Sequence, residues 1–143
     1  MKRHEEVSIL LIDDDELDTE VFRRGLIKKN LSYSLHIARD GIEGLEILRG
    51  QEGKTKLPKP YIILLDMNMP RMNGIEFLSE LRSDPELSSS LVFMLTTSMN
   101  QEDLSIAYRH NIAGYIIKND ICDGFLSAID MLDSYCKTVR IET

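Results

Sequence analysis

Five short apolar runs alternate with five longer amphipathic stretches, and this alternation is the feature that most restricts the fold of the chain. Repeated strand and helix units of this kind form a parallel sheet with helices packed on it. We therefore predict an α/β fold with a doubly wound, five-stranded parallel sheet flanked by five helices. The expected strands are residues 7–12, 33–38, 61–65, 91–95 and 114–117, and the expected helices are residues 16–29, 41–49, 74–83, 101–110 and 120–137.

The second run differs from the others because it alternates polar Ser34 and His36 with apolar Leu35 and Ile37. Such alternation leaves one face of a strand for solvent, which predicts a strand at the edge of the sheet with the all-apolar runs in the centre.

Apolar residues indicate the inward face of the first and last helices, and in the last helix they recur at steps of three and four residues, which mark one helical face. The residues expected to face inward from the first helix are Leu17, Val21 and Leu26. The corresponding stripe of the last helix is Phe125, Ile129, Leu132, Cys136 and Val139. The two cysteines, Cys122 and Cys136, lack a CxxC spacing or nearby histidines, so they are interpreted as reduced core thiols and not as zinc ligands.

Length and charge limit the classes of protein that fit. A chain of 143 residues is about one domain, so residues 1–143 are expected to form a single unit, with a core of about 6–138 and no output domain. The net charge of −7 argues against nucleic-acid binding, which needs a basic patch. No apolar stretch reaches the ~20 residues of a membrane span, nor does the N-terminus have a secretory signal, so no membrane association and a cytoplasmic location are expected.

Charged residues follow three of the apolar runs. Asp13, Asp14 and Asp15 end the first run, Asp66 ends the third and Lys118 ends the last. Because parallel strands present their carboxyl ends at one edge of a sheet, where open α/β folds place their sites, these groups are expected to converge.

The acidic residues have simpler interpretations as well. Asp13, Asp14 and Asp15 can serve as a helix N-cap and a favourable charge for the helix dipole, and Asp66 can cap a turn. An EF-hand loop fits poorly, because Asp18 stands where its glycine is needed. The alternative is a magnesium site, since Mg²⁺ takes one or two carboxylates and completes its shell with water and phosphate oxygens.

The complete set of residues favours phosphoryl chemistry. A carboxylate such as Asp66 can accept a phosphoryl group, provided that charge on the phosphoryl oxygens is neutralised. Magnesium, Lys118 and the hydroxyl of Thr96, which ends the fourth run, can each serve one oxygen.

With these motifs, the chain resembles a response-regulator receiver domain of bacterial two-component signalling over essentially all of its length. The resemblance rests on the segments Leu10–Asp14, Leu64–Gly74, Leu95–Ser98 and Gly114–Lys118. It implies a flavodoxin-like receiver fold with strand order 2-1-3-4-5. Within the family, the long polar loop before the third strand and the Leu-Thr-Thr-Ser stretch are similar to stand-alone regulators that partner phytochrome-type histidine kinases.

The resemblance also implies a role for each site residue. Asp66 corresponds to the phosphoacceptor, Asp13 and Asp14 to the acidic pair, and Asn68 to a metal ligand through its backbone carbonyl. Thr96 matches the switch hydroxyl and Lys118 the lysine that contacts phosphate. Tyr115 matches the aromatic switch position, although the residue alone is equally compatible with a static, half-buried aromatic. The remaining implied features are a Mg²⁺ cofactor, a histidine kinase or phosphotransfer protein as donor, and an output surface on the fourth helix, fifth strand and fifth helix.

One residue departs from the family pattern. The family usually has proline after the lysine, often in a cis peptide, whereas Asn119 follows Lys118 here. A non-proline cis bond costs about 2.5–4 kcal/mol, so a trans bond and a rearranged loop are expected.

Three functions are compatible with the sequence. The first is a phosphoacceptor that is not a true enzyme and that either acts as a switch through another protein or a second copy of itself, or serves as a phosphate sink. The second is a magnesium-dependent phosphatase of the haloacid dehalogenase kind, which needs a second aspartate where the chain has Asn68. The third is a receiver-like interaction module that works without phosphorylation.

Overall fold

The computed structural model describes residues 7–97, 100–118, 125–139 and 141, and it contains one parallel sheet with strand order β2-β1-β3-β4-β5. The strands are β1 (Ser8–Ile12), β2 (Ser34–Ala38), β3 (Tyr61–Asp66), β4 (Leu91–Thr96) and β5 (Gly114–Ile117). The helices are α1 (Glu16–Lys28), α2 (Gly41–Arg49), α3 (Gly74–Ser83), α4 (Gln101–Arg109) and α5 (Leu126–Thr138). The expected fold is confirmed, and β2 lies at an edge as its alternation predicted. The prediction that the all-apolar runs are central is wrong for β5, which forms the other edge and has alternate residues exposed.

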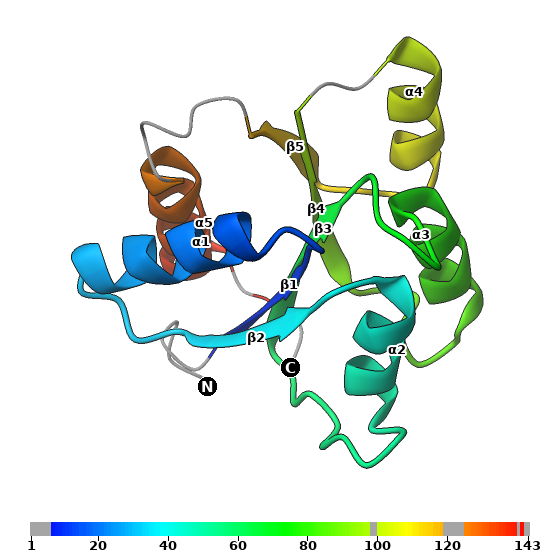
Figure 1. Ribbon diagram of the computed structural model, residues 1–143, viewed down its shortest axis with the longest axis horizontal. Coiled ribbons are helices and arrows are strands. Elements are labelled where there is room, and N and C mark those ends of the chain that lie inside the picture. The colour runs from blue at the N-terminus through cyan, green and yellow to red at the C-terminus, as the bar shows by residue number, and fades with distance from the viewer. Residues whose placement is uncertain (1–6, 98–99, 119–124, 140, 142–143) are drawn as a thin grey trace.

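Helices cover both faces of the sheet, with α1 and α5 on one face and α2, α3 and α4 on the other (Figure 1). Each face has its own apolar core. Phe22 of α1 packs with Ile129 of α5 on the first face, and Phe77 and Leu81 of α3 pack in the core of the second. The central strands β1 and β3 are buried along their whole length, which explains why their sequences are apolar throughout.

The prediction that Leu17 faces inward is wrong. Leu17 is 61% exposed, whereas the buried face of α1 is formed by Thr19, Phe22 and Leu26, together with Gly25. Asp15 caps the helix through hydrogen bonds to the backbone N–H groups of Leu17 and Asp18, and the resulting start places Leu17 on the solvent side of the first turn.

The predicted last helix, residues 120–137, is not continuous, and its first part, residues 120–124, lies outside the described residues. Phe125 has a left-handed backbone (φ 62°) and is the N-cap of α5, so α5 begins at Leu126. At the other end Val139 is the C-cap and is exposed, so it does not continue the buried stripe of α5.

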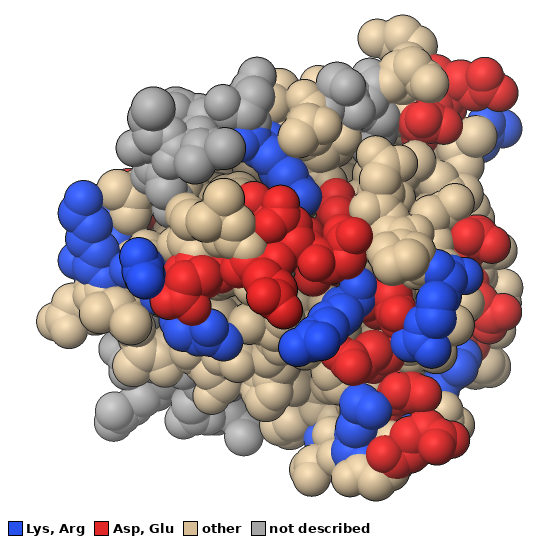
Figure 2. All heavy atoms as spheres, viewed as in Figure 1, with Lys and Arg blue, Asp and Glu red and all other residues tan. Residues whose placement is uncertain are grey.

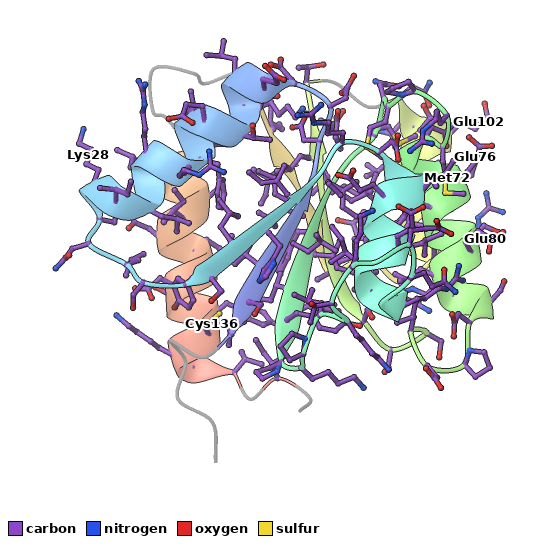
Figure 3. All side chains as sticks on the ribbon, turned by 60° about the horizontal axis from the view of Figure 1, so that its bottom comes forward. Lys28, Met72, Glu76, Glu80, Glu102 and Cys136 are labelled. Atoms are coloured by element: carbon purple, nitrogen blue, oxygen red, sulfur yellow. The ribbon has the colours of Figure 1, made fainter. Side chains whose placement is uncertain are left out.

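Cys136 is a free thiol buried between α5 and the sheet, as the sequence predicted (Figure 3). Burial raises the pKa of this thiol. The prediction for Cys122 falls outside the described residues, as does that for the peptide bond between Lys118 and Asn119. Among the residues that the structure describes, no helix is both long and apolar enough to cross a bilayer.

Candidate functional site

The register of the sheet brings three carboxylates together at its carboxyl edge. Ile12 of β1 pairs with Leu65 of β3, so Asp13 and Asp66 follow at the same level. Carboxylate oxygens of Asp13, Asp14 and Asp66 lie within 4.8 Å of one another. Figure 2 shows acidic side chains gathered near the centre of the viewed face. The predicted convergence of these acids is thus observed.

Lys118 joins this group from the end of β5. Its backbone N–H donates to the carbonyl of Thr96 at 2.8 Å, which holds it beside the end of β4. Its ammonium lies 2.9 Å from Asp13 Oδ2, 3.1 Å from Asp66 Oδ1 and 2.9 Å from Asp18 Oδ2. Lys118 is 9% exposed, so a single buried positive charge is shared among three carboxylates.

Burial controls the ionisation of the acids in this pocket. It raises the pKa of Asp13 to about 7, although a hydrogen bond from the backbone N–H of Asp15 and the Lys118 ammonium oppose the shift. Burial likewise raises the pKa of Asp66, and Lys118 offsets this only in part. For Lys118 itself, burial would lower the pKa, but the contacts with Asp18 and Asp13 outweigh it and raise the pKa. The lysine is therefore charged, while ionising Asp13 opposes folding.

The other predicted site residues occupy three different environments. Thr96 is buried at the end of β4, one residue beyond Leu95, which pairs with Asp66. Asn68 follows β3, and the interaction of its backbone N–H with the Asp66 carboxylate opposes the rise in the pKa of Asp66. Tyr115 is 42% exposed on β5. Thr96 and Asn68 thus lie next to the acids along the chain or the sheet, whereas Tyr115 presents its ring to solvent.

The turn after β3 is held by local interactions that the sequence encodes. Asn73 accepts a hydrogen bond from the backbone N–H of Glu76, and Glu76 accepts one from that of Asn73, so the pair forms a capping box for α3. At Gly74 an added Cβ would lie 3.0 Å from the carbonyl oxygen of Asp66 and 3.1 Å from Cα of Met67. Glycine is needed here because the start of α3 passes directly against the end of β3.

A second ion pair fixes the same turn to α2. Arg71, which has a left-handed backbone (φ 62°), donates Nε to Asp40 Oδ2 at 2.6 Å and Nη2 to Asp40 Oδ1 at 3.0 Å. Asp40 is buried and also caps α2 by accepting from the backbone N–H of Glu43. The side chain of Met72, labelled in Figure 3, packs against Gly41 at the start of the same helix. The turn that carries Asn68 is therefore anchored on α2.

Replacing Arg71 with glutamine is expected to lower the Tm at pH 7. Burial alone would raise the pKa of Asp40, but the Arg71 guanidinium outweighs it and holds the pKa below its usual value. Because the folded-state pKa is lowered, the pair stabilises the fold above about pH 4 and ceases to do so as the pH falls further. Thermal unfolding of both proteins from pH 7 to pH 3 should show the difference in Tm shrinking with acidity. A difference independent of pH would contradict this origin.

The donor set fits a divalent cation with oxygen ligands. Asp13 Oδ2 is buried and forms an ion pair with Lys118, but no donor of the described residues gives it an aligned hydrogen bond. Mg²⁺ is bound in proteins through a small number of carboxylates, with waters or phosphate oxygens as the remaining ligands. Asp13, Asp14 and Asp66 offer such carboxylates.

With this fold and this pocket described, the class of the protein follows. Residues 9–129 match the family model of the response regulator receiver domain, and the chain belongs to this family. Receiver domains are signalling proteins of two-component systems and not classical enzymes.

Individual relatives point to one branch of the family. The response regulator Rcp1 from Synechocystis is 30% identical over 127 residues, which cover 89% of this chain and 86% of Rcp1. The crystal structure of Mn²⁺-bound Rcp1 superposes with a TM-score of 0.80, with 96% of this chain and 99% of that chain covered at 30% identity. The phosphorylated cyanobacterial phytochrome response regulator RcpA gives a TM-score of 0.86 at 27% identity, with the same coverage. The resemblance to phytochrome-associated regulators is confirmed.

Sequence reasoning missed two residues of the site region, Asp18 and Arg71. Asp18 lies one turn after the N-cap Asp15, and its side chain is 15% exposed. Once α1 was placed with its N-terminus at the carboxyl edge of the sheet, an acid at this position was a detectable candidate. Nothing in the sequence around Arg71 indicates a role near the site, because its partner Asp40 is 31 residues away.

Proposed function

We propose that the protein is a phosphoacceptor switch in which Asp66 takes a phosphoryl group from a histidine kinase or a phosphotransfer protein. One observation carries the proposal: the buried ammonium of Lys118 lies 3.1 Å from Asp66 Oδ1 and 2.9 Å from Asp13 Oδ2. A cation in this position favours the charged form of a carboxylate that burial would otherwise protonate. It also lies where negative charge would develop on a transferred phosphoryl group.

In the proposed transfer, a carboxylate oxygen of Asp66 attacks the phosphorus of a phosphohistidine. The phosphorus–nitrogen bond breaks, its electron pair returns to the imidazole, and an aspartyl phosphate forms. Lys118 would donate to one phosphoryl oxygen and the hydroxyl of Thr96 to another. Mg²⁺ held by Asp13, Asp14, Asp66 and the backbone carbonyl of Asn68 would supply further charge neutralisation. The bound Mn²⁺ of Rcp1 and the phosphorylated state of RcpA support this assignment.

The proposed output uses the surface of α4, β5 and α5. The aromatic rings of Tyr108 and Tyr115 and the side chain of Ile117 are exposed there. Movement of Thr96 toward the phosphoryl group would leave space into which Tyr115 can turn, provided that the two states differ by only a few kcal/mol. The set of exposed apolar side chains would then differ between the two states, and so would the affinity for a downstream protein or for a second copy of the chain.

The test is phosphorylation by a small-molecule donor. Incubation with acetyl phosphate and Mg²⁺, followed by intact mass spectrometry, is expected to show one phosphoryl adduct in the wild type. Asp66→Asn or removal of the metal by EDTA should abolish it, because the nucleophile or the charge neutralisation is lost. Asp15→Asn is the matched control, since it removes an acid of the same run that lies outside the three-carboxylate group. A correctly folded wild type without any adduct would favour a phosphorylation-independent interaction module.

A further inference from the structure

We infer that Asp18 is a positioning residue that holds Lys118 in the pocket when the other acids are engaged elsewhere. This inference rests on the proposed phosphoacceptor function. Asp18 belongs to α1, whereas Lys118 directly follows β5, 100 positions later in the chain. Their contact links the helix that covers one face of the sheet to the edge that carries the site.

The three acceptors of the Lys118 ammonium are not equivalent. Asp18 Oδ2 accepts a hydrogen bond from Nζ at 2.9 Å and belongs to α1, whereas Asp13 and Asp66 lie at the carboxyl ends of β1 and β3. Asp13 and Asp66 also belong to the group of three carboxylates that could hold a cation, and Asp18 does not. Asp18 is therefore the acceptor that stays available to the lysine when a cation engages the other two.

A divalent cation changes the balance of charge around Lys118. When Asp13 and Asp66 bind the cation, they offset less of the positive charge of the Lys118 ammonium. Lys118 is only 9% exposed, so water solvates this charge poorly. A buried charge without a partner is strongly unfavourable, and two cations in one pocket repel. With Asp18 as its remaining partner, Lys118 keeps its place and can donate its other protons to a phosphoryl oxygen. Without Asp18, the ammonium would compete with the cation for Asp13 and Asp66.

The first turn of α1 holds Asp18 in place. Asp15 fixes the start of α1, and Asp18 donates its own backbone N–H to Asp15 Oδ1 at 3.4 Å. The side chain of Asp18 is 15% exposed, so it projects from a rigid helical turn into the pocket and not into solvent. A group held by a regular helix positions its partner better than one on a loop does.

The experiment compares Asp18→Asn with Glu16→Gln. Both changes remove one negative charge from the first two turns of α1, but the Glu16 side chain is 87% exposed and lies near Arg39, not Lys118. Mg²⁺ affinity is measured by titration calorimetry, and the structural control is thermal unfolding of the metal-free proteins. Asp18→Asn is expected to weaken Mg²⁺ binding about tenfold, the equivalent of one charge-assisted hydrogen bond. Glu16→Gln should change it less than about twofold, as expected for a screened surface charge.

A second measurement observes the lysine directly. With Mg²⁺ bound, the side-chain ammonium of Lys118 should give a protected ¹H–¹⁵N signal in the wild type, assigned by its absence in Lys118→Gln. The signal should be lost in Asp18→Asn and kept in Glu16→Gln. Equal Mg²⁺ affinities for the two variants, or an unchanged signal in Asp18→Asn, would overturn the role of Asp18. The proposed function would fail separately, through a wild type that acquires no phosphoryl adduct on Asp66.

Discussion

Asp13→Asn is expected to stabilise the metal-free protein by about 2–4 kcal/mol at pH 7.5, because it removes a carboxylate whose ionisation opposes folding. Asp13 is 1% exposed, and burial raises its pKa to about 7. Asparagine keeps the shape of the side chain and can still accept the backbone N–H of Asp15, which donates to Asp13 Oδ1 at 2.9 Å. The Lys118 ammonium retains Asp18 and Asp66.

The pH dependence identifies the origin of this gain. The folded-state pKa of Asp13 lies above its ordinary value of 3.8, so its favourable contribution is complete below that value and is lost as the pH rises through about 7. The advantage of Asp13→Asn should therefore shrink as the pH is lowered from 7.5 to 5.5. Urea unfolding in EDTA at several pH values measures it.

Added Mg²⁺ should make the wild type more stable than Asp13→Asn, the reverse of their order in EDTA. A ligand that binds the folded state stabilises it according to its affinity, and the variant lacks one of the carboxylates that would hold the cation. Mg²⁺ should thus raise the Tm of the wild type much more than that of Asp13→Asn. A variant less stable than the wild type in EDTA at pH 7.5 would show that the Asp13 charge favours folding. The expected result instead identifies Asp13 as a residue kept for binding at the expense of stability.

Arg82→Met is expected to destabilise the fold by about 2–3 kcal/mol through the loss of hydrogen bonds to backbone carbonyls. Arg82 of α3 donates Nε to the carbonyl of His110 at 2.7 Å and Nη2 to that of Asn111 at 3.1 Å. Its Nη1 donates to the carbonyls of Ser88 and Ser90, both at 2.8 Å. One guanidinium therefore joins the connection before β4 to the connection before β5.

The hydrogen bonds to two of these carbonyls are expected to account for most of the lost free energy of unfolding. The bonds to His110 and Ser90 are partly buried, so water replaces them poorly, whereas the bonds to Ser88 and Asn111 are exposed and water can take over. Arg82→Lys should recover little, because a compact ammonium cannot reproduce the planar fork of a guanidinium.

The matched control is Arg24→Met, which removes the same side chain type from a surface ion pair with Glu20. The Arg24 side chain is 77% exposed, and exposed pairs contribute about 0–1 kcal/mol. Urea unfolding of the three proteins at neutral pH compares their free energies of unfolding. Equal losses for Arg82→Met and Arg24→Met would show that the four carbonyls are satisfied equally well by water.

The sequence by itself determined the architecture of this protein and the main part of its candidate site. Apolar runs separated by amphipathic stretches predicted all five strands within one residue at each end, because strands buried on both faces must be apolar throughout. The convergence of Asp13, Asp66 and Lys118 was predictable for a related reason. Parallel strands end at one edge, so residues that directly follow them are neighbours whatever their separation along the chain.

Only the tertiary structure decided which side chains meet away from the strand ends. The contacts of Lys118 with Asp18 and of Arg71 with Asp40 join residues 100 and 31 positions apart, and each depends on how a helix or turn is rotated against the sheet. The same rotation decided that Leu17 is exposed while Thr19 is buried. Hydrophobic periodicity describes a helical face to within about one residue, which is 100° of rotation, whereas a hydrogen bond requires its two atoms to lie within a few tenths of an ångström of their ideal separation. That accuracy comes from packing of the whole fold.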